Sequence, residues 1–385
     1  MRKGLLAAVA ALGLVIAAAA YAGSPSSAGP QSAEGTLVTC GTTRTIGLLA
    51  PITGPAASLG ATQVKWVEYY VSTYNKTHRT KFRLRKADTK LGGPVSEAVK
   101  AARLLAPDEN VLAVVGAAGS QEVEATTATL KGGGVAFVSG SATRTTLTKG
   151  TARRGYFFRT VPPDAFQSRD AVAYMRTKLR ARNVFIIDDQ SSYSKGLADE
   201  VQGKLRRAGI TVNRESVAQN ESNFASLIAT IERDTQVVYI PWQLPPRGQA
   251  FGRQMRSAGK GNITLFGADG MFDPAVSGIG SNVYVSFFPI QPTNKTIKAY
   301  QRSHGGKGDF FGAPSYVAAQ VVGGAIDRAC RNGDATRAEV RREIAKTRLG
   351  STLLGSPVRF SPGGDVNPTK FGIYKSRNGQ FARVG

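Results

Sequence analysis

The sequence has 385 residues, a formal net charge of +24, and only two histidines and two cysteines. A charge this large suggests a nucleic-acid partner, but the basic residues are dispersed and lack the interleaved aromatic side chains of a base-stacking surface. Neither histidine lies near a cysteine or an acidic cluster, so a histidine-based metal site or catalytic triad is poorly supported. We therefore expect a solvated basic surface attracted to an anionic cell envelope, with no nucleic acid, metal or cofactor bound.

The N-terminus has the composition of a secretory signal. Arg2 and Lys3 supply its charged start, Leu5–Ala20 its apolar segment, and Ala20–Ala22 a cleavage site with small residues. The apolar segment is rich in alanine and shorter than the roughly 20 residues that a membrane span needs. The sequence therefore predicts an exported protein, placed in the periplasm or on the outer face of the cell envelope.

From Thr45 onward, segments typical of strands and helices alternate, which is the pattern of a parallel α/β sheet. The strands predicted in the first series are Thr45–Leu49, Phe82–Ala87, Val111–Val115 and Val135–Val138. Helices are predicted at Thr62–Tyr74, at Ser96–Leu105 and after Ser120. A crossing strand at Tyr156–Arg159 ends this series.

A second alternating series follows. Its predicted strands are Asn183–Ile187, Ile210–Asn213, Val237–Ile240, Thr264–Phe266 and a returning Val283–Phe287. Its predicted helices are Ala165–Leu179, Lys195–Ala208, Phe224–Glu232 and Gly248–Ser257. Helices resume at Lys295–Ser303, Pro314–Cys330 and Arg337–Lys346, and two strands at Val358–Phe360 and Phe371–Tyr374 complete the chain.

Two βα series of similar length, linked by strand-like crossings, predict an α/β fold with two lobes. Each lobe is expected to be a mostly parallel sheet flanked by helices, and the crossings are expected to form a hinge of several strands. The predicted parts are a signal peptide at 1–22, a flexible tether at 23–41, lobe 1 at 42–160 and 288–355, and lobe 2 at 161–287 and 356–385. Two cysteines in an exported protein suggest a disulfide between Cys40 and Cys330, with two free thiols as the alternative.

Hydroxyl side chains follow two of the predicted strands. Ser120 stands at a helix start after Val111–Val115, and Ser141 and Thr143 follow Val135–Val138. If these strands are parallel neighbours, the three residues meet at the carboxyl edge of one sheet, where open α/β sheets bind ligands. Hydroxyl groups and free N–H groups at a helix start suit an anion, most simply a carboxylate. The alternative is that each is an ordinary cap or turn residue.

Motifs for catalysis and nucleotide binding are missing from the sequence. No phosphate-binding G-x-x-x-x-G-K-[ST] loop, dinucleotide-binding glycine motif or G-x-S-x-G nucleophile motif is present. Ser192–Lys195 matches the S-x-x-K pattern, but its K-T-G and S-D-N companions are absent, so a chance match is favoured. An exported hydrolase remains an alternative, and the sequence predicts that the protein is not an enzyme.

The order of elements resembles the type I solute-binding proteins of ABC importers, in particular the group that binds leucine, isoleucine and valine. The resemblance covers nearly the whole mature chain, from Thr45 to Tyr374. Its anchors are Gly54-Pro55, Val115-Gly116 with Ser120, Ser139–Thr143, Tyr193–Ala198, Phe266–Gly270 and Tyr316–Ala319. The resemblance implies a periplasmic-binding-protein fold. We expect the protein to act as a monomer that delivers its ligand to a membrane permease.

The resemblance also implies roles for particular residues around an amino-acid zwitterion. Ser120 and Thr143 would hold the α-carboxylate with help from the backbone around Ser141, and Asp269 would face the α-ammonium from the other lobe. Tyr193 would cover the ligand. Phe311 would border the pocket.

Two positions depart from the family pattern. Leu59 falls where relatives often have an aromatic residue, and Gln243 falls near the place of a tyrosine. Because both positions shape the side-chain pocket, recognition of a zwitterion is better supported than a branched-chain or other apolar side chain. An amide, a urea-like solute, an aromatic acid, or an envelope-attaching role without a small ligand remain alternatives.

Overall fold

The computed structural model describes residues 35, 37–305, 311–366 and 370–385. The chain divides into two units, residues 1–31 and 32–385, and the description below concerns the second. The predicted signal peptide and most of the predicted tether lie outside the described residues. In the described part of the chain, no helix combines the length and apolar character that a membrane crossing requires.

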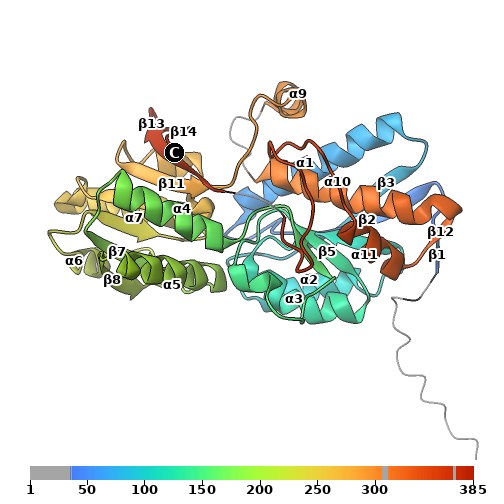
Figure 1. Cartoon of the computed structure of the whole chain (residues 1–385), viewed down its shortest axis with the longest axis horizontal. Coiled ribbons are helices and arrows are strands. Elements are labelled where there is room, and N and C mark those ends of the chain that lie inside the picture. The colour runs from blue at the N-terminus through green and yellow to red at the C-terminus, as the bar shows by residue number, and fades with distance from the viewer. Residues whose placement is uncertain (1–34, 36, 306–310, 367–369) are drawn as a thin grey trace, which may run out of the picture. The chain divides into compact units, whose positions relative to one another are not determined.

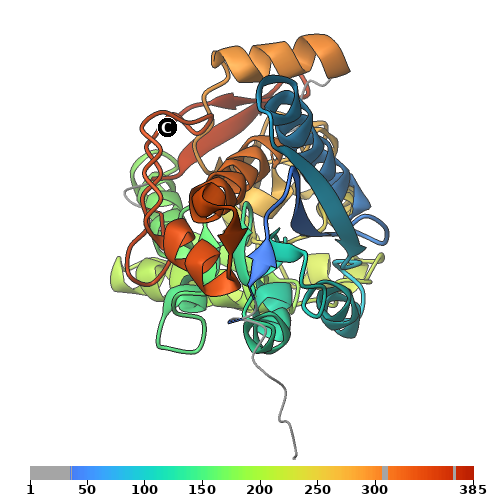
Figure 2. The ribbon, with the colours of Figure 1, turned by 90° about the vertical axis from the view of Figure 1, so that its right-hand side faces the viewer.

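The first sheet has five parallel strands in the order β3-β2-β4-β5-β6. The strands are β2 Thr43–Ala50, β3 Lys81–Asp88, β4 Val111–Val115, β5 Ala136–Ser139 and β6 Phe157–Arg159. Its helices are α1 Ala57–Thr77, α2 Ser96–Leu105, α3 Ser120–Gly132, α10 Gly312–Ala329 and α11 Arg337–Ala345. The pair α1 and α10 covers one face and the pair α2 and α3 the other, as the two views show (Figures 1 and 2). Both faces are therefore buried, which explains the unbroken apolar run of β4.

The second sheet has seven strands in the order β14-β13-β11-β10-β9-β7-β8. Its parallel strands are β7 Asn183–Asp188, β8 Thr211–Ser216, β9 Val237–Ile240, β10 Thr264–Gly267 and β11 Val283–Phe287. The antiparallel strands β13 Gly372–Arg377 and β14 Gln380–Arg383 extend it beyond β11. Its helices are α4 Asp164–Thr177, α5 Ser192–Arg207, α6 Ala225–Ala229, α7 Pro245–Met255 and α8 Pro274–Ser277.

The chain passes between the two sheets after β6, after β11 and before β13, and α9 Lys295–His304 follows the second passage (Figure 1). Two mostly parallel sheets flanked by helices confirm the predicted fold class. The lobe boundaries stay a prediction. Val358 and Val366 pack in the core of the first sheet, although the sequence placed 356–385 in lobe 2.

Two predictions in the second series and the tail were wrong, and one strand was missed. Val358–Phe360 is no strand and contributes only isolated bridges to Leu349 and Val366, because Pro357 and Pro362 flank it and proline cannot donate to a ladder. The predicted helix at Phe224–Glu232 is reduced to α6. Strand β14 was not predicted, although Asn378 and Gly379, both with positive φ, form the strongest kind of hairpin signal before it.

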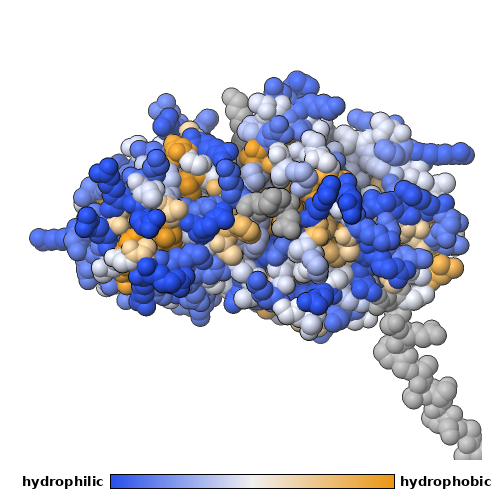
Figure 3. Space-filling view, in the orientation of Figure 1, coloured by the Kyte–Doolittle hydropathy of each residue, from blue (hydrophilic) through white to orange (hydrophobic). Residues whose placement is uncertain are grey.

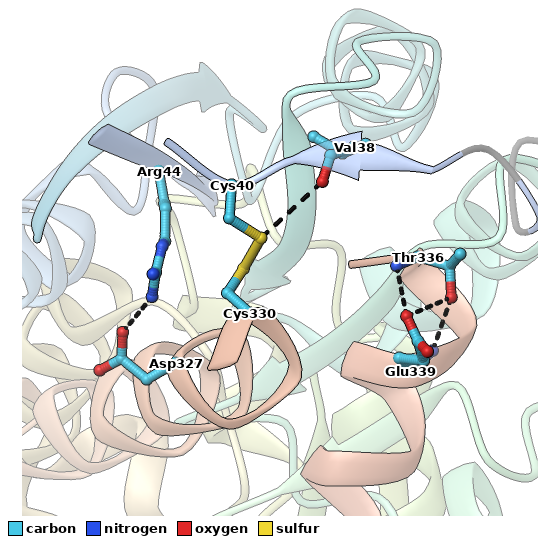
Figure 4. Close-up of a disulfide and its surroundings, with 7 residues drawn as sticks. All are labelled: Val38, Cys40, Arg44, Asp327, Cys330, Thr336 and Glu339. Atoms are coloured by element: carbon cyan, nitrogen blue, oxygen red, sulfur yellow. Dashed lines mark hydrogen bonds and ion pairs between the residues drawn. A yellow bond between two sulfur atoms is a disulfide. The ribbon is translucent and has the colours of Figure 1, made fainter. Parts of the chain in front are cut away.

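A disulfide joins Cys40 to Cys330 across 290 residues of sequence (Figure 4). It lies beside a short sheet made of β1 Val38–Thr39 and β12 Asp334–Ala335. Arg44 and Asp327 form an ion pair next to it, at 2.5 Å. The start of the described chain is therefore fastened covalently to the end of α10, within the first lobe.

One face of the molecule is mostly hydrophilic. Figure 3 shows one face covered largely by hydrophilic residues, with small separate hydrophobic patches. The exposed large hydrophobic side chains in the described residues are Leu37, Ile52, Val95 and Leu104. The basic character of the surface stays a prediction from the composition.

Candidate functional site

The predicted meeting of hydroxyl residues at one sheet edge is observed. β4 and β5 are parallel neighbours, so the segments that follow them emerge side by side. Ser120 begins α3, and its Oγ accepts a hydrogen bond from the backbone N–H of Arg144 at 3.3 Å. Ser141 Oγ donates to the carbonyl of Ala118 at 2.8 Å and accepts from Gln63 Nε2 at 2.9 Å.

The second lobe supplies residues from the matching edge of its own sheet. Tyr193 follows β7, Gln243 follows β9 and Asp269 follows β10. Tyr193 Oη donates to Asp269 Oδ1 at 2.6 Å, which fixes both side chains. The two sheets thus present the carboxyl ends of their strands to each other, the position at which α/β sheets hold ligands.

One pocket gathers residues from both edges. Its lining residues are Leu59, Leu91, Ala118, Ser120, Ser141, Tyr193, Gln243, Asp269, Gly270 and Phe311. Of the residues that the sequence predicted as ligand contacts, only Thr143 is missing from this lining. The roles of these residues toward a ligand stay a prediction.

Thr143 does not line the pocket. It is fully buried, and its Oγ1 makes no hydrogen bond within the described residues. Its carbonyl accepts a hydrogen bond from the Asp164 N–H at 2.8 Å. Among the described residues, the backbone N–H groups of Ser120 and Thr143 donate to no protein acceptor. Because Ser120 lines the pocket, its N–H is available for an anion at this end.

Asp269 gives the opposite end a negative charge. Its side chain is 3% exposed, and burial raises its pKa to about 6. No lysine or arginine of the described chain forms an ion pair with it. Asp164 is also fully buried near Asp269, and burial together with the Asp269 charge raises its pKa. A cation placed beside Asp269 would stabilise the ionised carboxylate, so this end of the pocket suits an ammonium group.

Three lining residues were not predicted as ligand contacts. Leu91 lies in the loop after β3, and Ala118 lies in the small-residue segment 117–119 after β4, which the sequence placed near the ligand without a role for this residue. Gly270 follows Asp269 directly. Their place in the sequence could have indicated them, because all three residues follow strands that end at the two sheet edges bordering the pocket.

The two lobes also touch outside the pocket. Ser192 at the start of α5 donates its hydroxyl to Glu124 Oε2 at 2.6 Å, and its carbonyl accepts from Arg144 Nη1 at 2.7 Å. These three residues form the interlobe bridge. Because the Ser192 hydroxyl is bound to Glu124 and Arg144, and not to Lys195, its surroundings are those of a structural contact and do not resemble an activated nucleophile. In the described part of the chain, no three acidic, histidine or cysteine side chains are grouped as a metal site would require.

Two facing α/β lobes with a polar pocket between them are the architecture of solute-binding proteins that close around a ligand. Residues 43–379 match the family model described as periplasmic binding protein. The chain therefore belongs to this family, as the resemblance in the sequence predicted.

The sequence identity to individual relatives is low. The chain is 27% identical to the Leu/Ile/Val-binding protein homolog 3 of Brucella melitensis over 351 residues, which cover 88% of this chain and 92% of the relative. It is 25% identical over 349 residues to the leucine-, isoleucine-, valine-, threonine- and alanine-binding protein of Pseudomonas aeruginosa, covering 86% of this chain and 89% of that one.

Solved structures show the same fold at low identity. A leucine-binding protein from Thermotoga maritima has a TM-score of 0.80 at 22% identity, covering 89% of this chain and 98% of its own. A solute-binding protein of an ABC transporter from R. palustris, in complex with benzoate, has a TM-score of 0.78 at 17% identity, with 89% and 96% covered.

Proposed function

We propose that this protein is an exported receptor that binds an amino acid between its two lobes and delivers it to the permease of an ABC importer. One observation carries the proposal: a buried carboxylate without a cationic partner, Asp269, lies across a pocket from the hydroxyl and N–H donors around Ser120. An α-carboxylate takes fixed donors and an α-ammonium takes a carboxylate, so the pocket is complementary to a zwitterion.

Closure of the lobes follows from this division of the site. Ser120 and Ser141 come from the first lobe, while Tyr193 and Asp269 come from the second. Only a closed arrangement lets one small ligand contact both ends. Ligand binding would therefore shift the protein toward the closed form, which is the form a permease would recognise.

The relatives support the ligand class. The Brucella and Pseudomonas proteins are named for branched-chain amino acids, and the latter also for threonine and alanine. The apolar half of the pocket, formed by Leu59, Leu91 and Phe311, suits the aliphatic part of such a side chain. Export is supported by the predicted signal peptide and by the family's periplasmic binding proteins.

A thermal-shift screen of the purified protein tests this proposal. All common amino acids, their amides and a set of aromatic acids are added at equal concentration. A ligand at 100 times its dissociation constant should raise the melting temperature by roughly 3–4 °C, because it binds only the folded state. Shifts confined to aromatic acids would support the benzoate-like alternative, and no shift with any compound would overturn the receptor proposal.

A further inference from the structure

The side-chain half of the pocket contains one polar group among apolar ones. Leu59, Leu91 and Phe311 supply hydrocarbon surface, and Gln243 adds a carboxamide that is 6% exposed. A carboxamide offers an acceptor oxygen and a donor nitrogen of nearly the same size, so the group can occupy the same space with either atom forward. The chemistry of this half therefore depends on which atom faces the ligand, and the hydrogen-bond network around Gln243 decides it.

The orientation of the network starts at Asp189. Each of its carboxylate oxygens already accepts two hydrogen bonds: Oδ1 from the Ser191 N–H at 3.0 Å and the Ser191 hydroxyl at 2.6 Å, and Oδ2 from the Gln243 N–H at 2.8 Å and Gln219 at 3.1 Å. A carboxylate in this role can only accept, so the Gln219 atom that faces it must be the donor Nε2.

That assignment passes along the network to Gln243. Gln219 Nε2 also lies 3.4 Å from the Gln243 carboxamide, and Gln121 Nε2 lies 2.7 Å from the same atom. The Gln243 atom that faces the Gln219 donor is the acceptor Oε1, and Gln121 then turns its own donor, Nε2, toward the same oxygen. The other atom, Gln243 Nε2, is then the donor, and it makes no hydrogen bond to any acceptor in the described chain.

The free donor lies next to Gly119, in the segment that supplies Ala118 and Ser120 to the pocket lining. A Cβ at Gly119 would come within 3.3 Å of Gln243 Nε2, and Gly119 sits between the lining residues Ala118 and Ser120. The absence of a side chain at Gly119 thus leaves room for this amide where the two lobes meet.

We propose that Gln243 is a specificity-determining residue: it presents an N–H donor to the ligand side chain and favours an amino acid whose side chain carries a hydrogen-bond acceptor over an aliphatic one of the same shape. This inference rests on the proposed function. An aliphatic side chain in the closed pocket would cover the donor and leave it unpaired, whereas a hydroxyl or carbonyl oxygen would satisfy it.

The test compares ligands of matched shape by calorimetry. Threonine is paired with valine and asparagine with leucine, and each ratio of dissociation constants is measured on the wild type and on Gln243→Met, which keeps the side-chain length without the donor. In at least one pair the wild type should favour the polar member by about 5- to 150-fold, the effect of an unpaired buried donor, and Gln243→Met should abolish that preference. Gln301→Met, on the exposed side of α9, is the control and should leave both ratios unchanged.

If Gln243→Met does not fold, Gln219→Leu replaces it, because loss of Gln219 frees the Gln243 carboxamide to turn over and should reduce the same preference. Tighter binding of the aliphatic member in both pairs, or ratios that neither variant changes, would overturn the inference while leaving the receptor proposal intact. If no amino acid binds, both proposals fail.

Discussion

Replacing Asp269 by Asn is the most informative single change in the site. Asn keeps an oxygen that accepts the Tyr193 hydroxyl, now at 2.6 Å from Asp269 Oδ1, so the local structure should persist. The change removes the negative charge that faces the ligand ammonium in a closed, water-poor cleft. Loss of one partner of such a pair costs about 2–5 kcal/mol, which corresponds to roughly 30- to 5,000-fold weaker binding.

Without ligand, the same substitution should stabilise the folded protein. The pKa of Asp269 in the folded protein is about 6, above its value of 3.8 in an unfolded chain. The native state therefore binds more protons between these values, and this group's contribution to stability is lost as pH rises through that window. At pH 8 the loss is on the order of 3 kcal/mol, so Asp269→Asn should be at least as stable as the wild type without ligand.

Isothermal titration calorimetry with the best amino acid from the screen measures the effect on binding, and urea unfolding at pH 8 measures the effect on stability. Asp234→Asn, an exposed aspartate of the same lobe, is the matched control and should change neither. An affinity of Asp269→Asn within about threefold of the wild type would refute the reasoning, because an ammonium paired with this carboxylate cannot lose it at so small a cost.

Three further predictions follow from the charges around the pocket. Wild-type affinity should fall about tenfold between pH 7 and pH 5, because the ligand ammonium needs ionised Asp269, whose pKa is about 6. Calorimetry below pH 6 should also detect proton release on binding. Affinity that is flat over this range would contradict the pairing. Arg144→Ala removes a hydrogen bond of the interlobe bridge, a contact that exists only in the closed form. The affinity for every ligand should therefore fall by the same factor, roughly 3- to 10-fold. A change in the ratio of affinities between two ligands would show that Arg144 acts inside the pocket. Burial raises the pKa of Glu122 from 4.5 to about 7, so its contribution to stability is lost as pH rises between those values. Glu122→Gln can still accept the Gly119 N–H. In urea unfolding, its gain in stability over the wild type should be larger at pH 8 than at pH 5.

Much of the first lobe could be predicted from the sequence because its local signals agree. Val111–Val115 is a short apolar run that ends at a glycine, and the structure begins and ends β4 at those residues. The same reasoning placed Ser120 and Ser141 at one edge, and both line the pocket. Position after a parallel strand was thus sufficient to locate the site.

Features that depend on how distant segments meet could not be predicted in this way. The contact between Gln121 and Gln243 joins residues of different lobes, and no local pattern encodes it. The hydrogen bond from the Asp164 N–H to the Thr143 carbonyl likewise joins segments that no local pattern brings together, and the predicted ligand role of Thr143 stays a prediction. The hairpin before β14 is different, since its Asn378-Gly379 turn is a local signal that the sequence carries by itself.

The most direct test of the account is a calorimetric comparison of three ligands with one carbon skeleton. They are the best-binding amino acid, the acid that lacks its amino group and the amine that lacks its carboxylate. If Ser120 and Asp269 hold opposite ends of a zwitterion from opposite lobes, both truncated ligands should bind at least about 30-fold more weakly than the amino acid. An acid without the amino group that binds as tightly as the amino acid would contradict that claim.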